Sequence, residues 1–475
     1  MPRRDDLEVR RGLHESCGIC GVYAPGEDVA RLTFFGLYTL QHRGQESAGI
    51  ATSDGERIRL HTGMGLVAQA IDDLALDRLR GDIAIGHTRY STMGSSRIIN
   101  AQPILLSGPA GQIALGHNGN IVNVEYLRRE LARRGYDFST TTDSEIIGKL
   151  ILSSVDEGWV AKIQYAMRRL QGAYSLVIMT KEALIGVRDP LGIRPLCLGT
   201  LNGGWMLASE SCVLDNLGAR FLREVEPGEI VLIDSSGVQS FKEGESEKRA
   251  GCVFEYIYFA RRDSVMNGRL IYPMRLAMGA RLAREYPVDA DMVIAVPDSA
   301  TAAAIGYARE SGLPFGEGLI DNRYVGRTFI QPDQGIRDVG VKIKFNPLPE
   351  ILAGKRLVVV DDTIVRGTTT ARVVGLLRRA GAKEVYMRVC APPLRYPCFF
   401  GIDIPTRGEL IAARETVPQI AEHIGADHLG YLSLEGLVEA VGLPREVLCL
   451  ACFTGEYPVS VQLEMDKFAL EAMKE

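Results

Sequence analysis

The sequence predicts two successive domains that both mix helices and strands, with a parallel α/β sheet in the second. At 475 residues the chain is long enough for two or more domains with cores of their own. Within 357–379 a strand-like apolar run is followed by two acids and then by a helical pattern. This order is typical of a buried parallel strand that precedes a helix. The polar run 242–248 is a candidate linker. We expect domains at 17–245 and 246–445, and a tail at 446–475.

The composition bounds the possible functions. Hydrophobic residues make up 46% and charged residues 24%, as in globular proteins of aqueous compartments. The net charge of −5 argues against bulk binding of nucleic acid or anionic lipid, although a local basic site is compatible with it. No apolar run reaches membrane-spanning length, and residues 1–16 lack the apolar core of a secretory signal. We therefore expect a cytoplasmic protein, with neither nucleic acid nor membrane as partner, whose nine cysteines are not in structural disulfides.

Four polar segments follow a Cys-Gly pair at Cys17 in the first half of the chain. They lie at 41–49, 86–92, 116–120 and 142–145. Each adjoins an apolar segment and most contain glycine, as do loops that present a site on a rigid scaffold. Singly each is weak, because a pair such as Asn-Gly is also common in hairpin turns. Their order after the cysteine is what argues for one shared site.

Together these segments resemble the class II glutamine amidotransferases, which are N-terminal-nucleophile hydrolases, over about residues 17–235. The resemblance implies an α+β fold built as an αββα sandwich. It also implies a role for five residues: Cys17 as nucleophile, Asn118 and the Gly119 N–H as the oxyanion hole, Arg89 for the glutamine α-carboxylate, and Asp143 for the α-ammonium. These residue types suit the chemistry, since amide cleavage needs a soft nucleophile and donors at the developing oxyanion.

The general base is the part that the motifs do not supply. No Cys/His/Asp triad is evident, and in the resembled family the α-amino group of the nucleophile is the base. An α-amine titrates at about 7.7–8.0, close to working pH, whereas an amide nitrogen cannot act as a base. Cys17 must then become the first residue, so residues 1–16 are a predicted propeptide. The Cys17/Cys20 pair could instead indicate redox chemistry or zinc, but no second such pair or His pair lies nearby.

The strand at 357–360 ends in two adjacent acids, and a run of small and hydroxyl residues leads into the next helix. Ligands of open α/β sheets bind at such strand ends, and helix N-termini attract phosphate. An ordinary solvated turn is the alternative. The segment resembles the phosphoribosyl pyrophosphate (PRPP) site of type I phosphoribosyltransferases, in which the acids bind the ribose hydroxyls, directly or through Mg²⁺, and the loop holds the 5-phosphate. The residues implied are Asp361, Asp362, Thr363, Gly367 and Thr368.

Two further segments are expected to complete this second site. The predicted strand 291–296 ends before Ser299, which either caps the next helix or, with Asp361 and Asp362, holds pyrophosphate or its Mg²⁺. The basic, glycine-punctuated stretch 322–344 is either a solvated loop or, as we expect from its length, a lid. As a lid it would supply Arg327 and Lys342 to PRPP and exclude water.

The order of the two halves resembles the glutamine PRPP amidotransferase family over nearly the whole chain. That resemblance implies glutamine-dependent synthesis of 5-phosphoribosylamine from PRPP, the first step of purine biosynthesis. It also implies a homotetramer inhibited by AMP- and GMP-type nucleotides. A PRPP-binding regulator without chemistry would instead show a basic helix-turn-helix and no nucleophile, and neither is seen. A glutaminase-only paralogue is disfavoured by the predicted lid and the paired acids.

Four cysteines in the second half form a separate signal. One branch of the resembled family holds a 4Fe–4S cluster with four cysteines in this order, and the matching positions here are Cys252, Cys398, Cys449 and Cys452. We expect a structural rather than a redox cluster. Four thiolates also suit zinc, and sequence alone does not separate the metals. Buried free thiols are the third alternative.

Overall fold

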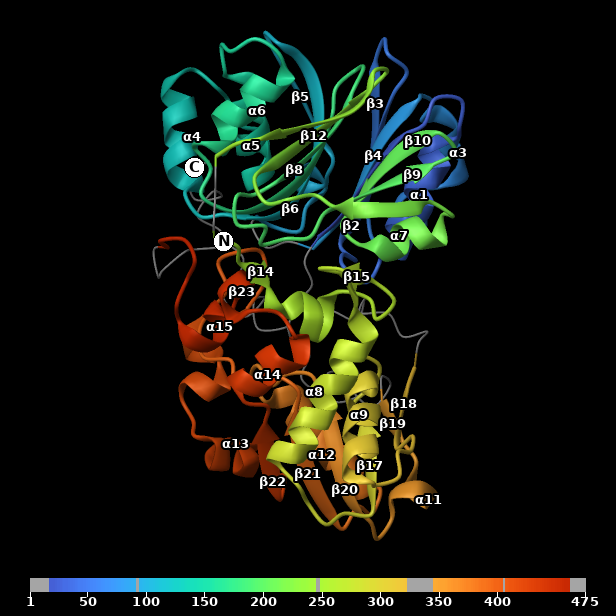
Figure 1. The fold of residues 1–475 in the computed structure, drawn as a ribbon, viewed down its shortest axis with the longest axis vertical. Coiled ribbons are helices and arrows are strands. Elements are labelled where there is room, and N and C mark those ends of the chain that lie inside the picture. Colours follow the sequence, from blue (N-terminus) through green and yellow to red (C-terminus); the bar gives the residue numbers. More distant parts are fainter. Residues whose placement is uncertain (1–16, 91–93, 245–247, 323–344, 405, 462–475) are drawn as a thin grey trace.

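The computed structural model describes residues 17–90, 94–244, 248–322, 345–404 and 406–461. Figure 1 shows an elongated molecule in which the first half of the chain forms one end and the second half forms the other. No helix among these residues is both long enough and apolar enough to cross a membrane.

Two antiparallel sheets form the centre of the first domain. In spatial order, the seven-stranded sheet comprises β11 (Arg220–Glu224), β9 (Cys197–Leu201), β10 (Gly204–Ala208), β1 (Gly18–Tyr23), β4 (Ile83–Arg89), β2 (Ser47–Ser53) and β3 (Ile58–Met64). The six-stranded sheet comprises β13 (Gly237–Lys242), β12 (Glu229–Asp234), β8 (Leu184–Arg188), β7 (Gly172–Met179), β6 (Gly111–Ile121) and β5 (Ile104–Gly108).

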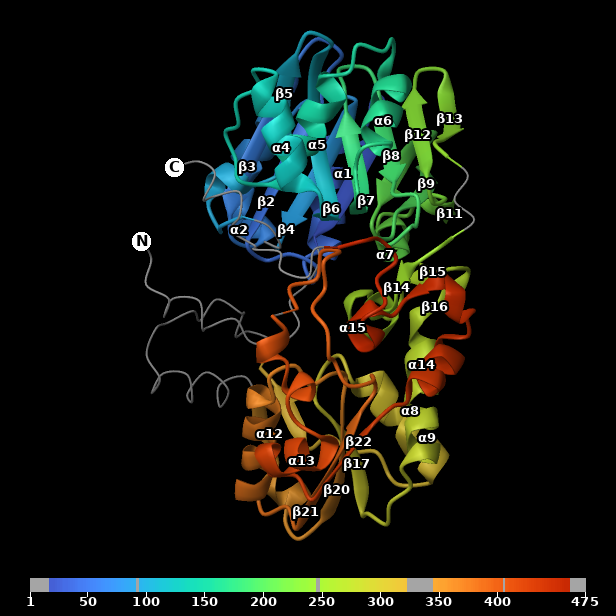
Figure 2. The same ribbon diagram turned by 90° about the vertical axis from the view of Figure 1, so that its left-hand side faces the viewer.

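Helices cover the outer face of each sheet (Figure 1), and Figure 2 looks onto the helices of the six-stranded sheet. The seven-stranded sheet carries α1 (Val29–Thr39) and α7 (Ser211–Asn216), and the six-stranded sheet carries α4 (Val124–Arg133), α5 (Asp143–Leu152) and α6 (Trp159–Met167). A third core, which includes Ile19, Ile85 and Val177, fills the space between the sheets. Since both faces of both sheets are covered, the inner strands are buried almost throughout, whereas the edge strands β3, β11 and β13 are largely half-buried or exposed. The predicted αββα sandwich is confirmed.

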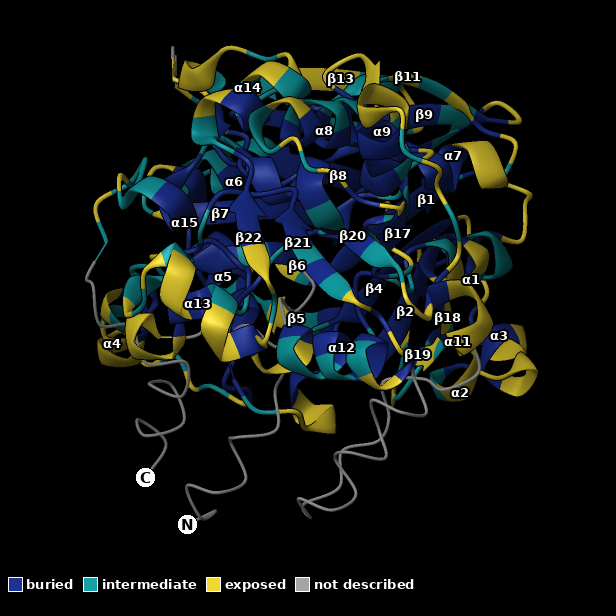
Figure 3. Ribbon diagram, turned by 90° about the horizontal axis from the view of Figure 1, so that it is seen from below, coloured by how far each residue is buried: buried dark blue, intermediate teal, exposed yellow. Residues whose placement is uncertain are grey.

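The second domain is built on a four-stranded parallel sheet in the order β17 (Met292–Ala295), β20 (Arg356–Asp361), β21 (Glu384–Val389) and β22 (His428–Tyr431). One face packs on α8 (Ile271–Glu285), α9 (Thr301–Ser311) and α14 (Leu434–Val441), and the other on α12 (Thr368–Arg379) and α13 (Val417–Ile424). In Figure 3 the strands are largely buried while the outer surfaces of α12 and α13 are partly exposed. The predicted α/β architecture is confirmed.

Short elements connect these layers. They are α2 (Val67–Ala70), α3 (Asp73–Arg78), β14 (Gly251–Cys252), β15 (Val265–Met266), β16 (Arg269–Leu270), β18 (Leu319–Asp321), β19 (Phe345–Pro347), α11 (Pro349–Leu352), β23 (Leu448–Cys449) and α15 (Ala451–Thr454). The described residues also contain a π-helical segment, η3 (Glu255–Phe259), and the 3₁₀ turns η2 (Ile98–Asn100), η4 (Arg407–Glu409), η5 (Ile411–Ala413) and η6 (Arg445–Val447).

The two domains share both a core and a set of buried charges. Ala173 of the first domain packs in one cluster with Phe400 of the second. The guanidinium of Arg43 lies between the carboxylates of Glu210, from its own domain, and Glu255, from the second. Arg194 approaches the same Glu255 carboxylate at 3.2 Å, and all four side chains are fully buried. Two cations therefore balance two anions in the buried interface between the domains.

Candidate active site

Strand register brings the predicted nucleophile to the end of a neighbouring strand. Gly18 pairs with Thr88 across the antiparallel β1–β4 contact, so Cys17 lies beside Arg89 and Tyr90. The Cys17 thiol donates a hydrogen bond to Tyr90 O at 3.3 Å, and Tyr90 N donates to the sulfur at 3.5 Å. Among the described residues no histidine bonds this thiol. Burial raises the pKa of Cys17 to about 11, so the thiol is neutral near pH 7 and needs a base.

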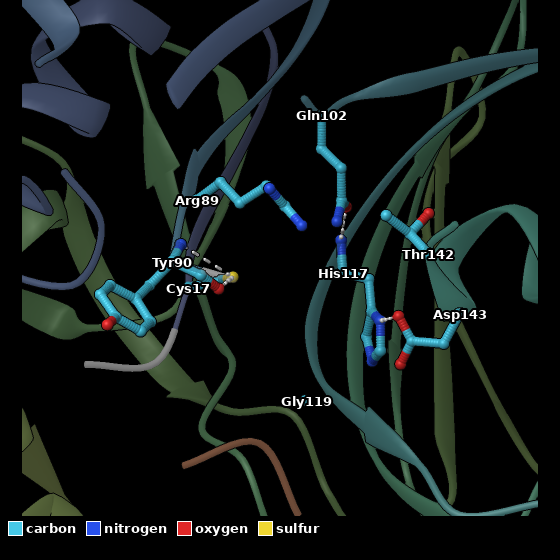
Figure 4. Close-up of a pocket in the computed structure, with 8 residues that line it drawn as sticks. All are labelled: Cys17, Arg89, Tyr90, Gln102, His117, Gly119, Thr142 and Asp143. Atoms are coloured by element: carbon cyan, nitrogen blue, oxygen red, sulfur yellow. Dashed lines mark hydrogen bonds and ion pairs between the residues drawn. The ribbon is translucent and has the colours of Figure 1, made fainter. Parts of the chain in front are cut away.

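The thiol opens into a pocket that lies between the two sheets of the first domain (Figure 4). The pocket is lined by Cys17, Arg89, Tyr90, Gln102, His117, Gly119, Thr142 and Asp143. Arg89 comes from β4 in one sheet, and Asp143 begins helix α5 on the other. The pocket therefore places a cation, a carboxylate and a nucleophile around one space, an arrangement that suits an amino acid with a reactive side chain.

The Arg89 guanidinium is held in place by Glu46, which lies in the first polar segment. Its Nη1 donates to Glu46 Oε1 at 2.5 Å and to Ser95 O at 3.3 Å. Sequence reasoning assigned no role to Glu46. The only signal for Glu46 in the sequence is a general rule, namely that a buried arginine needs an anionic partner.

The Asp143 carboxylate accepts hydrogen bonds from Ile121 N at 3.2 Å and Ser144 Oγ at 3.4 Å, and it lies 3.5 Å from His117 Nδ1. Burial alone would raise the pKa of Asp143, but His117 and the backbone N–H groups outweigh it and lower that pKa. The carboxylate is therefore ionised at neutral pH, as binding of an ammonium requires.

The predicted oxyanion-hole residues lie in strand β6, not in the loop that the Asn-Gly pair suggested. Gly119 lines the pocket and has φ +146°, and a Cβ there would lie 2.1 Å from Ala173 O. Asn118 is fully buried, does not line the pocket, and has no hydrogen-bond partner for either amide atom within the described chain. The local signal for a turn was misleading because the glycine serves close approach to the neighbouring strand β7 of the same sheet.

A second group of predicted residues gathers at the carboxyl ends of β17 and β20, which are parallel neighbours. Ser299 Oγ donates to Asp362, whose other carboxylate oxygen accepts from Thr363 Oγ1 at 2.7 Å. Asp362 N donates to Asp361 Oδ1 at 2.9 Å. One hydroxyl and two carboxylates thus offer oxygen atoms at one place, and this donor set fits Mg²⁺.

Helix α12 starts directly after this group. Gly367, with φ +80°, precedes the helix, and Thr368 is its first residue. A Cβ on Gly367 would lie 2.8 Å from Ile411 Cδ1, so both backbone angle and space favour glycine. The free N–H groups of the first turn lie at the same end of the sheet as the paired acids, as phosphate binding requires.

Arg275 of α8 is a cation near these acids that sequence reasoning missed. Burial raises the pKa of Asp362, while Ser299, Thr363 and the charge of Arg275 act in the opposite direction. Arg275 itself is buried, donates to Tyr256 O at 2.9 Å and to Ala260 O at 2.7 Å, and has its pKa lowered to about 10 by that burial. An arginine on the buried face of a helix was the available signal.

The proposed propeptide, residues 1–16, and the proposed lid cations Arg327 and Lys342 lie outside the described residues.

The four cysteines of the second half come together from three chain segments. Cys252 pairs with Cys449 across the β14–β23 contact, Cys452 lies on α15, and Cys398 accepts a hydrogen bond from Phe400 N at 3.3 Å. Burial raises the pKa of each thiol, and the pKa of Cys452 is raised further by the other three.

The donor set fits a cluster of thiolate ligands, because four thiols, of which those of Cys252 and Cys452 are buried, lie near one another and the cation Arg194 lies beside Cys252 and Cys398. In the described ranges, no group of three or more His, Cys, Asp or Glu is spaced to hold a single metal ion.

Known proteins share this domain order. A family model described as a glutamine amidotransferase domain matches residues 87–216. The amidophosphoribosyltransferase of Synechococcus elongatus is 51% identical over 487 aligned residues, covering 100% of this chain and 99% of that protein. The protein of the same name from Drosophila melanogaster is 48% identical, covering 94% of this chain and 90% of that one.

Two solved structures are similar over almost their full length. One, described as the allosteric regulatory enzyme of purine biosynthesis, has a TM-score of 0.90 and 44% identity, covering 97% of this chain and 99% of that one. The other is the glutamine PRPP amidotransferase of B. subtilis in complex with ADP and GMP, with a TM-score of 0.90 and 44% identity over 95% of this chain and 99% of that one. With relatives of this identity and coverage, the chain belongs to the amidophosphoribosyltransferase family.

Proposed function

We propose that this chain makes 5-phosphoribosylamine from glutamine and PRPP, with release of glutamate and pyrophosphate, as the first step of purine biosynthesis. The observation that carries the proposal is the pocket of Figure 4, in which Cys17 faces the space between Arg89 and Asp143. A cation and an anion on opposite sides select the α-carboxylate and α-ammonium of an amino acid, and the thiol is then placed for its side chain.

In the first half-reaction Cys17 attacks the glutamine amide carbon. Its thiol proton passes to its own α-amine and from there to the departing nitrogen, which leaves as ammonia. Water then hydrolyses the thioester to give glutamate and the free thiol. Gly119 N–H and the side-chain amide of Asn118, which has no partner in the part of the chain that the structure describes, are the proposed donors to the oxyanion of both tetrahedral states.

In the second half-reaction ammonia attacks the anomeric carbon of PRPP, the bond from that carbon to pyrophosphate breaks, and the nitrogen loses a proton. Asp361 and Asp362 would bind the ribose hydroxyls, while Thr363, Gly367, Thr368 and the start of α12 would hold the 5-phosphate. Ser299 and the two acids would hold Mg²⁺, which when bound supplies positive charge to the leaving pyrophosphate. Arg327 and Lys342 are proposed to add charge from the lid.

Removal of residues 1–16 is part of the proposal, because the chemistry above requires a free amine on Cys17. The high thiol pKa supports this need for a base.

Cys252, Cys398, Cys449 and Cys452 are proposed to hold one 4Fe–4S cluster. Hydrogen bonds from backbone N–H groups to sulfur, such as that from Phe400 N to Cys398, are among the contacts by which proteins tune such clusters. The cluster would tie the entrance of the second domain to its tail, since Cys252 and Cys449 sit on paired strands. None of the four cysteines lines the glutamine pocket, which favours a structural role.

The remaining expectations concern regulation and setting. The B. subtilis relative was solved with ADP and GMP, which supports purine nucleotides as inhibitors here. We also propose a cytoplasmic homotetramer.

The decisive experiment measures pyrophosphate release from PRPP with glutamine and, separately, with ammonia. Cys17→Ala is expected to lose the glutamine-dependent reaction and to keep the ammonia-dependent one. Cys20→Ala is a matched control, because Cys20 is also buried in this region but packs in the core behind β1. Wild-type protein that releases no pyrophosphate with either nitrogen source would refute the proposal.

A further inference from the structure

A short segment of the second domain lies against the glutaminase strand that carries Gly119. The segment is Phe399–Gly401, and it follows Cys398 directly. Asn120 Nδ2 donates to Phe399 O at 3.0 Å, and Arg194 Nε donates to Phe400 O at 2.9 Å; both bonds are buried. In Figure 4 the orange ribbon that passes below Gly119 belongs to the second domain.

The backbones of Gly401 and Gly119 are in direct contact. Gly401 has φ +95°, and a Cβ there would lie 2.8 Å from Gly119 C and 2.9 Å from Gly119 O. On its other side Gly119 is equally confined, since its own Cβ would lie 2.1 Å from Ala173 O. Gly119 is therefore held between strand β7 of its own domain and a loop of the other domain.

We propose that Gly401 is a positioning residue for glutamine hydrolysis: by packing on the Cα, C and O atoms of Gly119, it lets the second domain fix the backbone that carries the Gly119 N–H. The inference rests on the proposed function, in which the Gly119 N–H is an oxyanion donor. A donor stabilises a transition state only if it is already oriented, and the loss of one such donor costs about 10²–10³ in kcat. The contact acts on Gly119 and not on substrate, so glutamine binding is left to Arg89 and Asp143.

Hydrogen bonds hold the loop Phe399–Gly401 of the second domain in place against the glutaminase domain. Phe399–Gly401 is fixed at three points: by Asn120, by Arg194, and by the hydrogen bond from Phe400 N to the Cys398 sulfur. Arg194 is in turn paired with Glu255 of the second domain. A displacement of the second domain is thereby transmitted to the backbone at Gly119.

Gly401→Ala tests the proposal, with Gly408→Ala as matched control. Alanine at 401 meets both an unfavourable φ and the Gly119 backbone, whereas a Cβ at Gly408, in the same part of the chain, would meet nothing within 4 Å. For Gly401→Ala we expect a fall in glutaminase kcat of about 100-fold, a glutamine KM within about threefold of wild type, and unchanged ammonia-dependent synthesis. Gly408→Ala is expected to match wild type in all three.

A second readout and a second variant keep the test decisive. Alkylation of Cys17 by iodoacetamide forms no oxyanion, so its rate reports the reactivity of the thiol alone. This rate is expected to be unchanged in Gly401→Ala. If that variant does not fold, Asn120→Ala removes the hydrogen bond to Phe399 O without adding volume, and kcat should fall at least tenfold at constant KM.

Three results would overturn the proposal: an unchanged kcat, a rise in KM that accounts for the loss, or a parallel fall in Cys17 alkylation. Failure of the proposed function would look different, because wild type and Gly408→Ala would then also lack glutamine-dependent synthesis.

Discussion

Two forms of the chain, one with an amine and one with an amide at the nitrogen of Cys17, test the proposed base. In the first, residues 1–16 are removed, so that Cys17 follows an initiator methionine that aminopeptidase removes. In the second, residues 1–15 are removed and Ser16→Lys is introduced, since a bulky second residue retains the methionine. Intact-mass measurement establishes the terminus of each form before any assay.

The expected difference follows from the environment of the thiol. With a pKa of about 11, the Cys17 thiol is ionised in only about one molecule in 3,000 at pH 7.5. An α-amine with a pKa of about 7.7–8.0 is about one-third neutral at the same pH and can accept the proton. A positioned base contributes about 10²–10⁴ in rate, so the amine form should exceed the amide form by about 10³ in glutaminase kcat.

The pH dependence separates the two forms as well. Below its raised pKa the thiolate fraction grows tenfold with each pH unit, so the amide form should speed up about tenfold per unit between pH 7 and 10. The amine form should level off above about pH 8, where its base is already neutral. Glutamate release is the assay. Equal rates in the two forms, or parallel pH profiles, would refute the α-amine as base.

Other perturbations have equally specific outcomes. Asp362→Asn should lower PRPP turnover at least about 100-fold while basal glutaminase survives, as measured by pyrophosphate and glutamate release; equal losses of both would contradict the assignment. Asp143→Asn should raise the glutamine KM by about 10- to 100-fold, or about 1.4–2.8 kcal/mol; an unchanged KM would count against ammonium binding. Cys449→Ser should lose iron and lower the Tm of anaerobically purified protein, whereas a colourless and fully active wild type would contradict the cluster. Arg43→Met should lower the free energy of unfolding by about 3–5 kcal/mol, because it removes the cation shared by two buried carboxylates and leaves Glu210 with His42 and Glu255 with Arg194 alone. Burial opposes ionisation of Glu210, but Arg43 and His42 hold its pKa well below the usual value. The loss of unfolding free energy in Arg43→Met should therefore shrink as the pH falls below about 4.5, and a loss that does not depend on pH would contradict this reasoning.

Local patterns were sufficient wherever burial follows directly from sequence. The run Leu357–Val360 was predicted to be buried on both faces, and its alternate residues do pack into two different cores. The strand that follows Cys17 was also predictable, and its residues are buried on both faces, in the core between the sheets and in the core under α1. In both cases the decisive interactions repeat with the period of a strand.

Features that depend on distant parts of the chain were not accessible in this way. Asn118 and Gly119 suggested a turn, but pairing with Ser175 and Tyr174 keeps them in a strand. The pairing of Glu46 with Arg89 depends on how β2 and β4 are brought together, which no short segment specifies. The contact of Gly401 with Gly119 joins positions in different domains, and a glycine in a loop has many simpler explanations. The predicted domain bounds and catalytic roles stay predictions.

The buried charges between the domains also bear on the order of events during synthesis of the chain. Arg43 and Arg194 are both made before Glu255, the carboxylate that lies between them. A nascent chain that ends near residue 245 therefore contains two interior cations and only one of their two counter-ions, Glu210. An unpaired buried charge is strongly destabilising, so we expect the glutaminase domain to reach its folded state only after the first segment of the acceptor domain has emerged from the ribosome. Such an order would prevent a half-made chain from consuming glutamine before it has anywhere to send the ammonia.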